Sequence, residues 1–156
     1  SDEEAVLENK IAEYDAFLTK QDPAFTVEEL EEAMQKVMDQ YAGGIGTHYQ
    51  FNEKQLAMAE EKIKKLQILA KGLAAADMHE LMFIYELKER LTVCLTVIAH
   101  LRARKETRWH SFAENLDYPE KSDAWLCYVN SKKNGDQITM IRRDLVKGGE
   151  TYEHRD

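Results

Sequence analysis

The residues best suited to chemistry form a short group of cations that follows a long apolar segment. Four basic residues lie within seven positions, and only Glu106 opposes them: Arg102, Arg104, Lys105 and Arg108. Guanidinium groups bind carboxylates and phosphates through paired hydrogen bonds, and Trp109 follows directly, as aromatic residues often do at interfaces. Two interpretations stay open. The cations complement the dipole at the end of a helix, or they contact an anionic group or acidic surface outside this chain.

The remaining candidate residues do not form a recognisable catalytic or metal site. The histidines (His48, His79, His100, His110 and His154) lack the HExxH spacing, and none follows a glutamate by three positions as in di-iron bundles. Cys94 lies in an apolar run that should keep its thiol buried and protonated. Gly43 to Gly46 is rich in glycine, but it follows a helical pattern, so it predicts a helix end and no phosphate cradle. We therefore predict no catalytic, cofactor-binding or metal-binding residue in this chain.

Composition restricts the classes of protein and partner. The chain has 156 residues, of which 44% are hydrophobic and 32% charged, as expected for one globular domain with its own core. No apolar run is long enough for a membrane span, and two unpaired cysteines without a signal peptide indicate the cytoplasm. The net charge is −8, and the acids are concentrated in residues 1–32. Because phosphate would be repelled there, nucleic acid is not an expected partner.

The spacing of apolar residues predicts a bundle of four to five helices. Helices are expected over residues 4–20, from Val27 to about 43, from about 53 to 72 and over 78–104. Three N-terminal caps support them: Thr26 with Glu29, Asn52 with Gln55, and Asp77 with Glu80. Residues 91–101 are apolar on nearly all sides, which places the fourth helix at the centre of the predicted bundle.

The last part of the chain has the pattern of a small hairpin. Residues 124–130 and 137–141 are rich in strand-forming residues, and the turn-forming residues 133–136 separate them. We expect a mainly α domain over residues 1–146, with this hairpin at 124–141, and a polar tail over residues 147–156.

Several segments resemble one family of flavoproteins. Residues 103–108 (ARKETR) are similar to the ARxESR segment near the C-terminus of succinate dehydrogenase and fumarate reductase flavoproteins, and Asp117-Tyr118-Pro119, Asp123 and Trp125 follow in the same order. The resemblance is closer to one branch, the alpha subunit of adenylylsulfate reductase. The matching pieces are DQYAGGI at 39–45, DMHELM at 77–82, ETRW at 106–109 and WLCYVNSK at 125–132.

The resemblance implies that this chain is the C-terminal helical domain of a larger FAD-dependent oxidoreductase and performs no chemistry alone. It implies FAD in the parent protein, FAD-binding and capping domains as partners in the same chain, and a separate iron–sulfur subunit. In the adenylylsulfate reductase branch, adenylylsulfate is converted to AMP and sulfite. His110-Ser111-Phe112 departs from both branches, so a fumarate reductase-like or succinate dehydrogenase-like parent with another substrate stays an alternative, as does a free-standing helical interaction module.

The resemblance also gives the cationic segment a role. We predict that Arg104, Arg108 and Trp109 lie at the interface with the FAD-binding and capping domains. Because those partners are absent from this chain, the side chains are expected to be exposed or mobile here.

Overall fold

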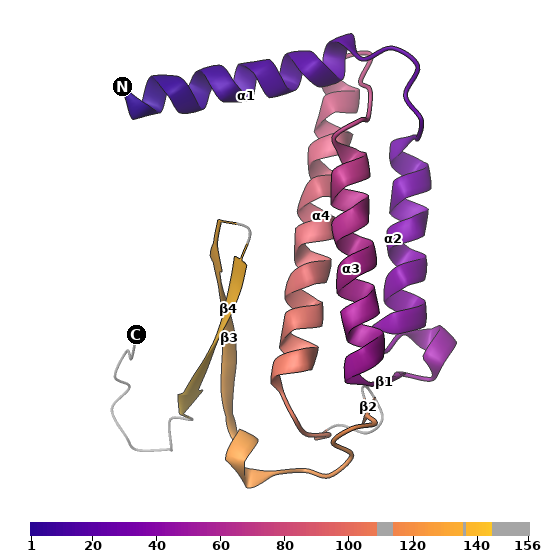
Figure 1. Cartoon of the computed structure of the whole chain (residues 1–156), viewed down its shortest axis with the longest axis vertical. Coiled ribbons are helices and arrows are strands. Elements are labelled where there is room, and N and C mark those ends of the chain that lie inside the picture. The colour runs from indigo at the N-terminus through magenta and orange to yellow at the C-terminus, as the bar shows by residue number, and fades with distance from the viewer. Residues whose placement is uncertain (109–113, 136, 145–156) are drawn as a thin grey trace. The chain divides into compact units, whose positions relative to one another are not determined.

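Four α-helices and a C-terminal hairpin make up most of the described chain (Figure 1). The computed structural model describes residues 1–108, 114–135 and 137–144. The helices are α1 (Asp2–Thr19), α2 (Val27–Tyr41), α3 (Glu53–Ala70) and α4 (Met78–Ala103), and the strands are β1 (Gln50–Phe51), β2 (Glu114–Asn115), β3 (Cys127–Asn134) and β4 (Gln137–Asp144). This arrangement confirms the predicted mainly α class. Within the described residues, no helix is long and apolar enough to cross a membrane.

The chain divides into two compact units. The first contains residues 1–37 and 61–94, and the second contains residues 38–60 and 95–156. The core of the first unit is mainly aliphatic, and its largest fully buried side chains are Leu30, Ile63, Leu73, Ile84, Leu87 and Leu91. In the second unit, Phe51, Leu56, Ala59 and Ile98 are buried together with three polar residues, Glu106, Thr107 and Asn115. Buried polar groups need hydrogen-bond partners, so these three residues indicate a buried polar centre in the second unit.

The predicted helix caps are present. Glu29 donates its backbone N–H to Thr26 Oγ1 at 3.1 Å, and Glu80 donates to Asp77 Oδ1 at 2.9 Å. The backbone N–H of Gln55 donates to Asn52 Oδ1 at 2.8 Å. Each bond satisfies an N–H group that the first turn of a helix leaves without an intrahelical partner. The starts of α2, α3 and α4 are therefore confirmed.

The prediction that the second half of α4 is buried on most sides is wrong. Leu91 and Ile98 are buried, but Val93 is 55% exposed and Val97 is 41% exposed. The first half of α4 contributes more to the core, through Leu81, Ile84 and Leu87. An apolar sequence on all sides of a helix predicts neighbours on all sides, and the described chain supplies them on only part of this helix.

The hairpin is confirmed, but its strands begin and end at other residues than predicted. Residues 123–125 form a 3-10 turn, in which Trp125 donates its N–H to Ser122 O at 3.1 Å, so β3 begins at Cys127. The strands pair in antiparallel register from Cys127↔Asp144 to Asn134↔Gln137. Gly135 adopts a positive φ of 62° in the connecting turn, a conformation that favours glycine. The first strand extends to Asn134 because the turn needs fewer residues than predicted, and the second extends to Asp144 because its last residues pair with the start of β3.

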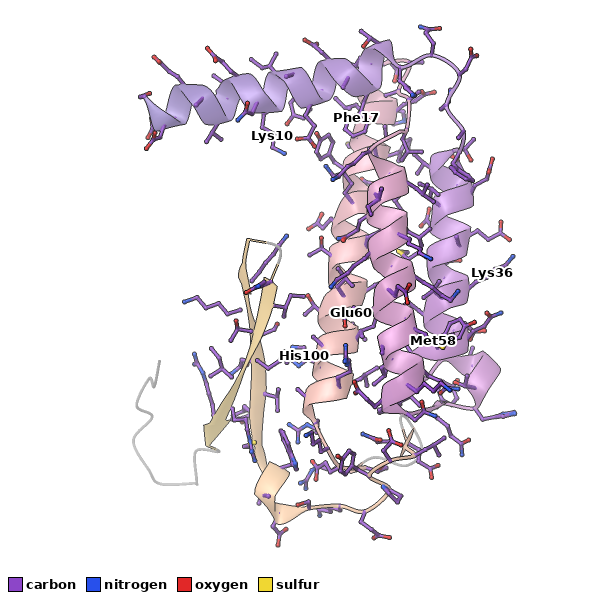
Figure 2. The ribbon with its side chains drawn as sticks, viewed as in Figure 1. Lys10, Phe17, Lys36, Met58, Glu60 and His100 are labelled. Carbon is purple, nitrogen blue, oxygen red and sulfur yellow. The ribbon has the colours of Figure 1, made fainter. Side chains whose placement is uncertain are left out.

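The C-terminal end of α1 is anchored within the first unit. Phe17, near the end of α1 in Figure 2, is buried, and its ring lies edge-on to Tyr85 with centroids 5.9 Å apart. Its carbonyl accepts the N–H of Ala75 at 2.9 Å. Lys88 Nζ donates to Glu13 Oε1 at 2.6 Å and lies over the Tyr85 ring. An aromatic contact and an ion pair therefore hold the last turns of α1 on α4, and a backbone hydrogen bond joins them to the segment before α4.

The Glu13–Lys88 pair predicts a loss of stability in acid. The pKa of Glu13 is lowered from 4.5 to about 2, chiefly by the hydrogen bond from Lys88. A carboxylate whose pKa is lower in the folded state stabilises the protein above its unfolded pKa and loses this contribution as the pH falls through the folded pKa. We expect Glu13→Gln to reduce the fall in melting temperature between about pH 4.5 and 2. Glu8→Gln, on an exposed turn of α1, is the control, and equal pH profiles for both variants would contradict the prediction.

Candidate domain-docking site

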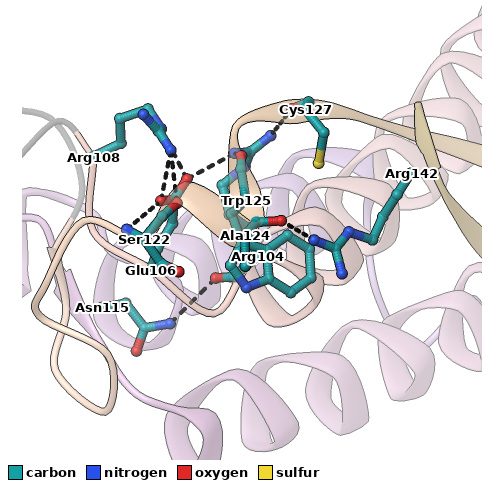
Figure 3. Close-up of polar contacts among 9 residues, drawn as sticks. All are labelled: Arg104, Glu106, Arg108, Asn115, Ser122, Ala124, Trp125, Cys127 and Arg142. Carbon is teal, nitrogen blue, oxygen red and sulfur yellow. Dashed lines mark hydrogen bonds and ion pairs between the residues drawn. The ribbon is translucent and has the colours of Figure 1, made fainter. Parts of the chain in front are cut away.

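A buried carboxylate organises the segment that follows α4 (Figure 3). Glu106 Oε1 accepts hydrogen bonds from Arg104 Nη1 at 2.8 Å and from Arg108 Nε at 2.9 Å. Its other oxygen, Oε2, accepts from Arg108 Nη2 at 2.8 Å and from the backbone N–H of Ser122 at 3.0 Å. Four donors therefore satisfy a side chain that has no exposed surface. Charged groups are tolerated inside proteins when they are paired and hydrogen-bonded in this way.

Electrostatics favours the ionised form of Glu106. Burial alone would raise the pKa of this carboxyl, but the hydrogen bonds from Arg108, Ser122 and Arg104 outweigh it and lower the pKa. The charge of Glu106 therefore contributes to stability at neutral pH, and this contribution is lost in acid.

Arg104 links this centre to the base of the hairpin. Its guanidinium donates to the carbonyl oxygens of Trp125 at 2.7 Å and Cys127 at 2.8 Å. These carbonyls belong to the 3-10 turn and to the first residue of β3. Because one rigid guanidinium contacts Glu106 and both carbonyls, Arg104 fixes where the hairpin leaves the helical part of the second unit.

A second cation supports the same turn from the other strand. Arg142, on β4, stacks on Trp125 with its guanidinium carbon 3.9 Å from the ring centroid, and it also donates to the carbonyl of Ala124. Stacking of arginine on an aromatic face is a favourable cation–π contact. Trp125 is therefore held by Arg142 through its ring and by Arg104 through its carbonyl.

Thr107 and Asn115 hold the loop that leads to the hairpin. Thr107 Oγ1 accepts the backbone N–H of Asn115 at 2.9 Å and donates to Tyr118 O at 2.8 Å. The backbone N–H of Thr107 donates to Glu120 O at 3.2 Å. Asn115 Oδ1 accepts from the N–H groups of Asp117 and Tyr118. These bonds fold residues 114–122 over the segment that carries Glu106.

Two further contacts attach this loop to α3 and to the segment before it. Strand β1 pairs with β2 in parallel, with Gln50 opposite Glu114 and Phe51 opposite Asn115. Asp117 Oδ2 accepts the first N–H of α3, that of Glu53, at 2.6 Å. Arg102, at the end of α4, donates to Glu53 Oε1 at 2.9 Å and is paired with Glu60. Residues 50–51 and 114–115, which lie outside the predicted helices and hairpin, therefore form two short paired strands.

The structure brings Arg104 and Arg108 together, but in another environment than predicted. Their side chains are 31% and 16% exposed and share the carboxylate of Glu106. The expectation that both are exposed in this chain is wrong, because the chain itself supplies their partners. Trp109 lies outside the described residues. Glu106, Ser122 and Asn115 were not identified as site residues, and the position of Glu106 between two arginines was the only signal for any of them.

The glycine-rich loop after α2 does not fit a phosphate group. The carboxylate of Asp39 occupies it, and Asp39 Oδ1 accepts the N–H of Gly46 at 2.8 Å. A phosphate would be repelled by that charge and would find this N–H already bonded. The helix ends at Tyr41, and Gly43 follows with a φ of 75°. The predicted helix end is confirmed, and this loop offers no site for the phosphates of FAD.

Gly44→Ala should therefore destabilise the chain, because the loop packs directly on α2. A Cβ at Gly44 would lie 2.4 Å from Asp39 Cα, which is backbone and cannot move aside. We expect a loss of about 1–3 kcal/mol, the usual cost of overpacking, in urea unfolding. Gly72→Ala is the matched control, since its Cβ would meet only Leu69 O at 3.5 Å. Equal unfolding midpoints for the two variants would contradict this account of the loop.

Comparison with known proteins identifies the family of this chain. The model of the family described as fumarate reductase flavoprotein C-term matches residues 31–150. The chain belongs to this family. The family consists of FAD flavoproteins, and the matched range contains the whole Glu106 centre and the hairpin.

Individual relatives are larger proteins. The alpha subunit of adenylylsulfate reductase from Megalodesulfovibrio gigas is 34% identical over 98 residues, which are 62% of this chain and 15% of that protein. The solved adenylylsulfate reductase of Archaeoglobus fulgidus is 32% identical, with a TM-score of 0.85 over 96% of this chain and 26% of that one.

Two further solved structures show the same fold. An adenosine-5-phosphosulfate reductase in covalent complex with sulfite is 34% identical, with a TM-score of 0.78 over 91% of this chain and 24% of that one. A variant of Escherichia coli quinol fumarate reductase is 16% identical, with a TM-score of 0.74 over 96% of this chain and 26% of that one. The chain therefore spans about a quarter of the solved relatives, as predicted for the C-terminal domain of such a flavoprotein.

Proposed function

We propose that the protein to which this domain belongs is an FAD-dependent oxidoreductase that converts adenylylsulfate to AMP and sulfite. The observation that carries the proposal is the contrast in identity between relatives of similar fold. Two adenylylsulfate reductases are 32% and 34% identical to this chain, whereas the quinol fumarate reductase is 16% identical. The reduction needs two electrons, and a partner subunit with iron–sulfur clusters, in the cytoplasm, would deliver them. This domain contributes binding surface and no catalytic residue.

Within that protein, the segment containing Arg104, Arg108 and Trp109 contacts the FAD-binding and capping domains. Support comes from the way in which Glu106 and its four donors fix this segment. Interfaces bind more tightly when their residues are already ordered. Large apolar side chains of the same unit are exposed nearby in the sequence: Leu116, Tyr118, Leu126 and Tyr128. Contact with the neighbouring domains would cover them.

The test is the activity of the full-length protein with its neighbouring gene product. With a chemical reductant such as reduced viologen as electron source, adenylylsulfate should be consumed and AMP and sulfite released in equal amounts. Fumarate is the control substrate. Turnover of fumarate and not adenylylsulfate would favour the alternative in which the parent is a fumarate reductase-like enzyme. A gene without any flavin-binding segment would favour a free-standing helical module and overturn the proposal.

The 156-residue chain alone should bind no FAD. The only glycine-rich loop among the described residues is closed by Asp39, and a dinucleotide site needs free N–H groups at a helix start. After incubation with excess FAD and gel filtration, we expect the protein to carry no flavin absorbance, and the full-length protein to carry about one FAD. Stoichiometric flavin on the short chain would contradict the assignment of FAD to the other domains.

A further inference from the structure

The first half of α1 presents an apolar stripe that nothing in the described chain covers. Every residue from 1 to 12 is exposed. Among them, Val6 is 63% exposed, Leu7 is 61% exposed and Ile11 is 50% exposed. Leu7, Ile11, Tyr14 and Leu18 follow one another at intervals of four, three and four residues, which places them on one face of the helix. The stripe continues into the anchored end of α1, where Tyr14 lies edge-on to Tyr85.

A helix that only extends into solvent has no need of exposed apolar side chains such as these. A short helix without tertiary packing is marginal in water, and solvated extensions of this kind do not need apolar residues at helical spacing. Ser1 nevertheless caps α1 through a full capping box with Glu4. A capped helix with an uncovered apolar face is typical of a surface that packs against a partner.

The charge of α1 argues against a second copy of the same helix as that partner. Residues 2–19 contain one cation, Lys10, and six acids: Asp2, Glu3, Glu4, Glu8, Glu13 and Asp15. Two copies brought together along this stripe would juxtapose like charges, which is costly at interfaces. The partner surface should therefore be apolar in its middle and basic at its edges.

The comparisons show that relatives of this domain belong to longer chains. The Archaeoglobus fulgidus structure matches 96% of this chain, so about six of the 156 residues have no counterpart, fewer than the 18 residues of α1. Most of α1 therefore has a counterpart in that solved chain, of which the matched region makes up 26%. The family match begins at residue 31, so α1 lies on its amino-terminal side.

We propose that Leu7 and Ile11 on α1 dock onto the FAD-binding part of the same polypeptide, in an apolar groove with basic edges. This inference rests on the proposed function, because it requires that part to exist. It assigns a second contact to the domain, distinct in sequence from the segment around Glu106. Its chemistry also differs, since the α1 contact is apolar with acidic edges and the Glu106 segment is cationic.

The experiment compares two pairs of substitutions with the same charge change. Leu7→Glu with Ile11→Glu places two carboxylates in the stripe, and Ala5→Glu with Asn9→Glu places two on the opposite side of the same exposed turns. In the full-length flavoprotein, we expect the first pair to speed proteolytic release of this domain about tenfold relative to the second, as for loss of an interface anchor. In the 156-residue chain, the two double variants should have the same melting temperature, because all four positions are exposed.

Each outcome has a separate meaning. The full-length protein could bind flavin and reduce its substrate while proteolysis releases this domain at the same rate from both double variants. In that case α1 docking is overturned and the proposed function stands. If light scattering finds dimers of the 156-residue chain that Leu7→Glu with Ile11→Glu dissociates, the occupant is a second copy and the proposal is wrong. If the gene encodes no flavin-binding part, the proposed function fails first.

Discussion

Glu106→Gln is expected to destabilise this chain by about 3–5 kcal/mol, the usual cost of removing one partner from a buried ion pair. The substitution keeps the volume of the side chain but removes its charge. Glu106 is the shared partner of Arg104 and Arg108, and its side chain has no exposed surface. Both guanidinium groups would lose their counter-charge while remaining partly buried.

Hydrogen bonding makes glutamine a poor replacement in either orientation of its amide. Each oxygen of Glu106 accepts from two donors, Oε1 from Arg104 and Arg108, and Oε2 from Arg108 and Ser122. An amide has one acceptor oxygen and one NH₂ group. Whichever way it turns, the NH₂ group faces two N–H donors, and these donors remain unsatisfied.

Urea unfolding measures this effect, with Glu120→Gln as the control. Glu120 belongs to the same segment and is exposed, so the same chemical change there should alter stability by less than about 0.5 kcal/mol. The strands near this centre contribute little to circular dichroism at 222 nm. Tryptophan fluorescence is the better probe of unfolding, because Trp125 lies near this centre. A loss below about 1 kcal/mol for Glu106→Gln would mean that the ion pairs contribute little to stability.

The sequence predicted the helices of this fold well because helix starts are specified locally. Thr26, Asn52 and Asp77 each cap a helix through a bond to a residue three positions later. Such signals need no knowledge of the rest of the chain. The exposed Val93 and Val97 on α4 show the limit of this reasoning, since apolar spacing indicates that a face is apolar and does not indicate whether this chain covers it.

The Glu106 centre could be predicted only in part, because most of its bonds join residues far apart in the chain. Ser122 lies 16 residues from Glu106, and Cys127 lies 23 residues from Arg104. The parallel pairing of β1 with β2 joins residues 50–51 to residues 114–115. Strands of two residues have no detectable alternation of polar and apolar residues. The cationic segment was recognised from its composition, but its internal carboxylate partner was not.

Arg108→Ala should destabilise the 156-residue chain by about 2–3 kcal/mol, the cost of hydrogen bonds to a charged partner. Arg108 donates twice to Glu106 and once to Ser122 O at 3.1 Å. The exposed side chain that the sequence predicted would have contributed far less to the stability of this chain. Arg108→Lys should lie between alanine and the natural residue, because lysine keeps the charge and loses the planar fork that contacts both carboxylate oxygens.

The same substitution separates an internal role of Arg108 from a role in docking. If the segment also contacts the FAD-binding and capping domains, Arg108→Ala in the full-length flavoprotein should additionally weaken flavin retention, by a further ~1–3 kcal/mol. Flavin release during urea titration measures this additional loss of flavin retention, and Glu120→Gln again serves as the control. An equal loss of stability in both proteins, with unchanged flavin release, would restrict Arg108 to holding Glu106 in place. The docking proposal for Arg108 would then be wrong, because its guanidinium would be fully used within this domain.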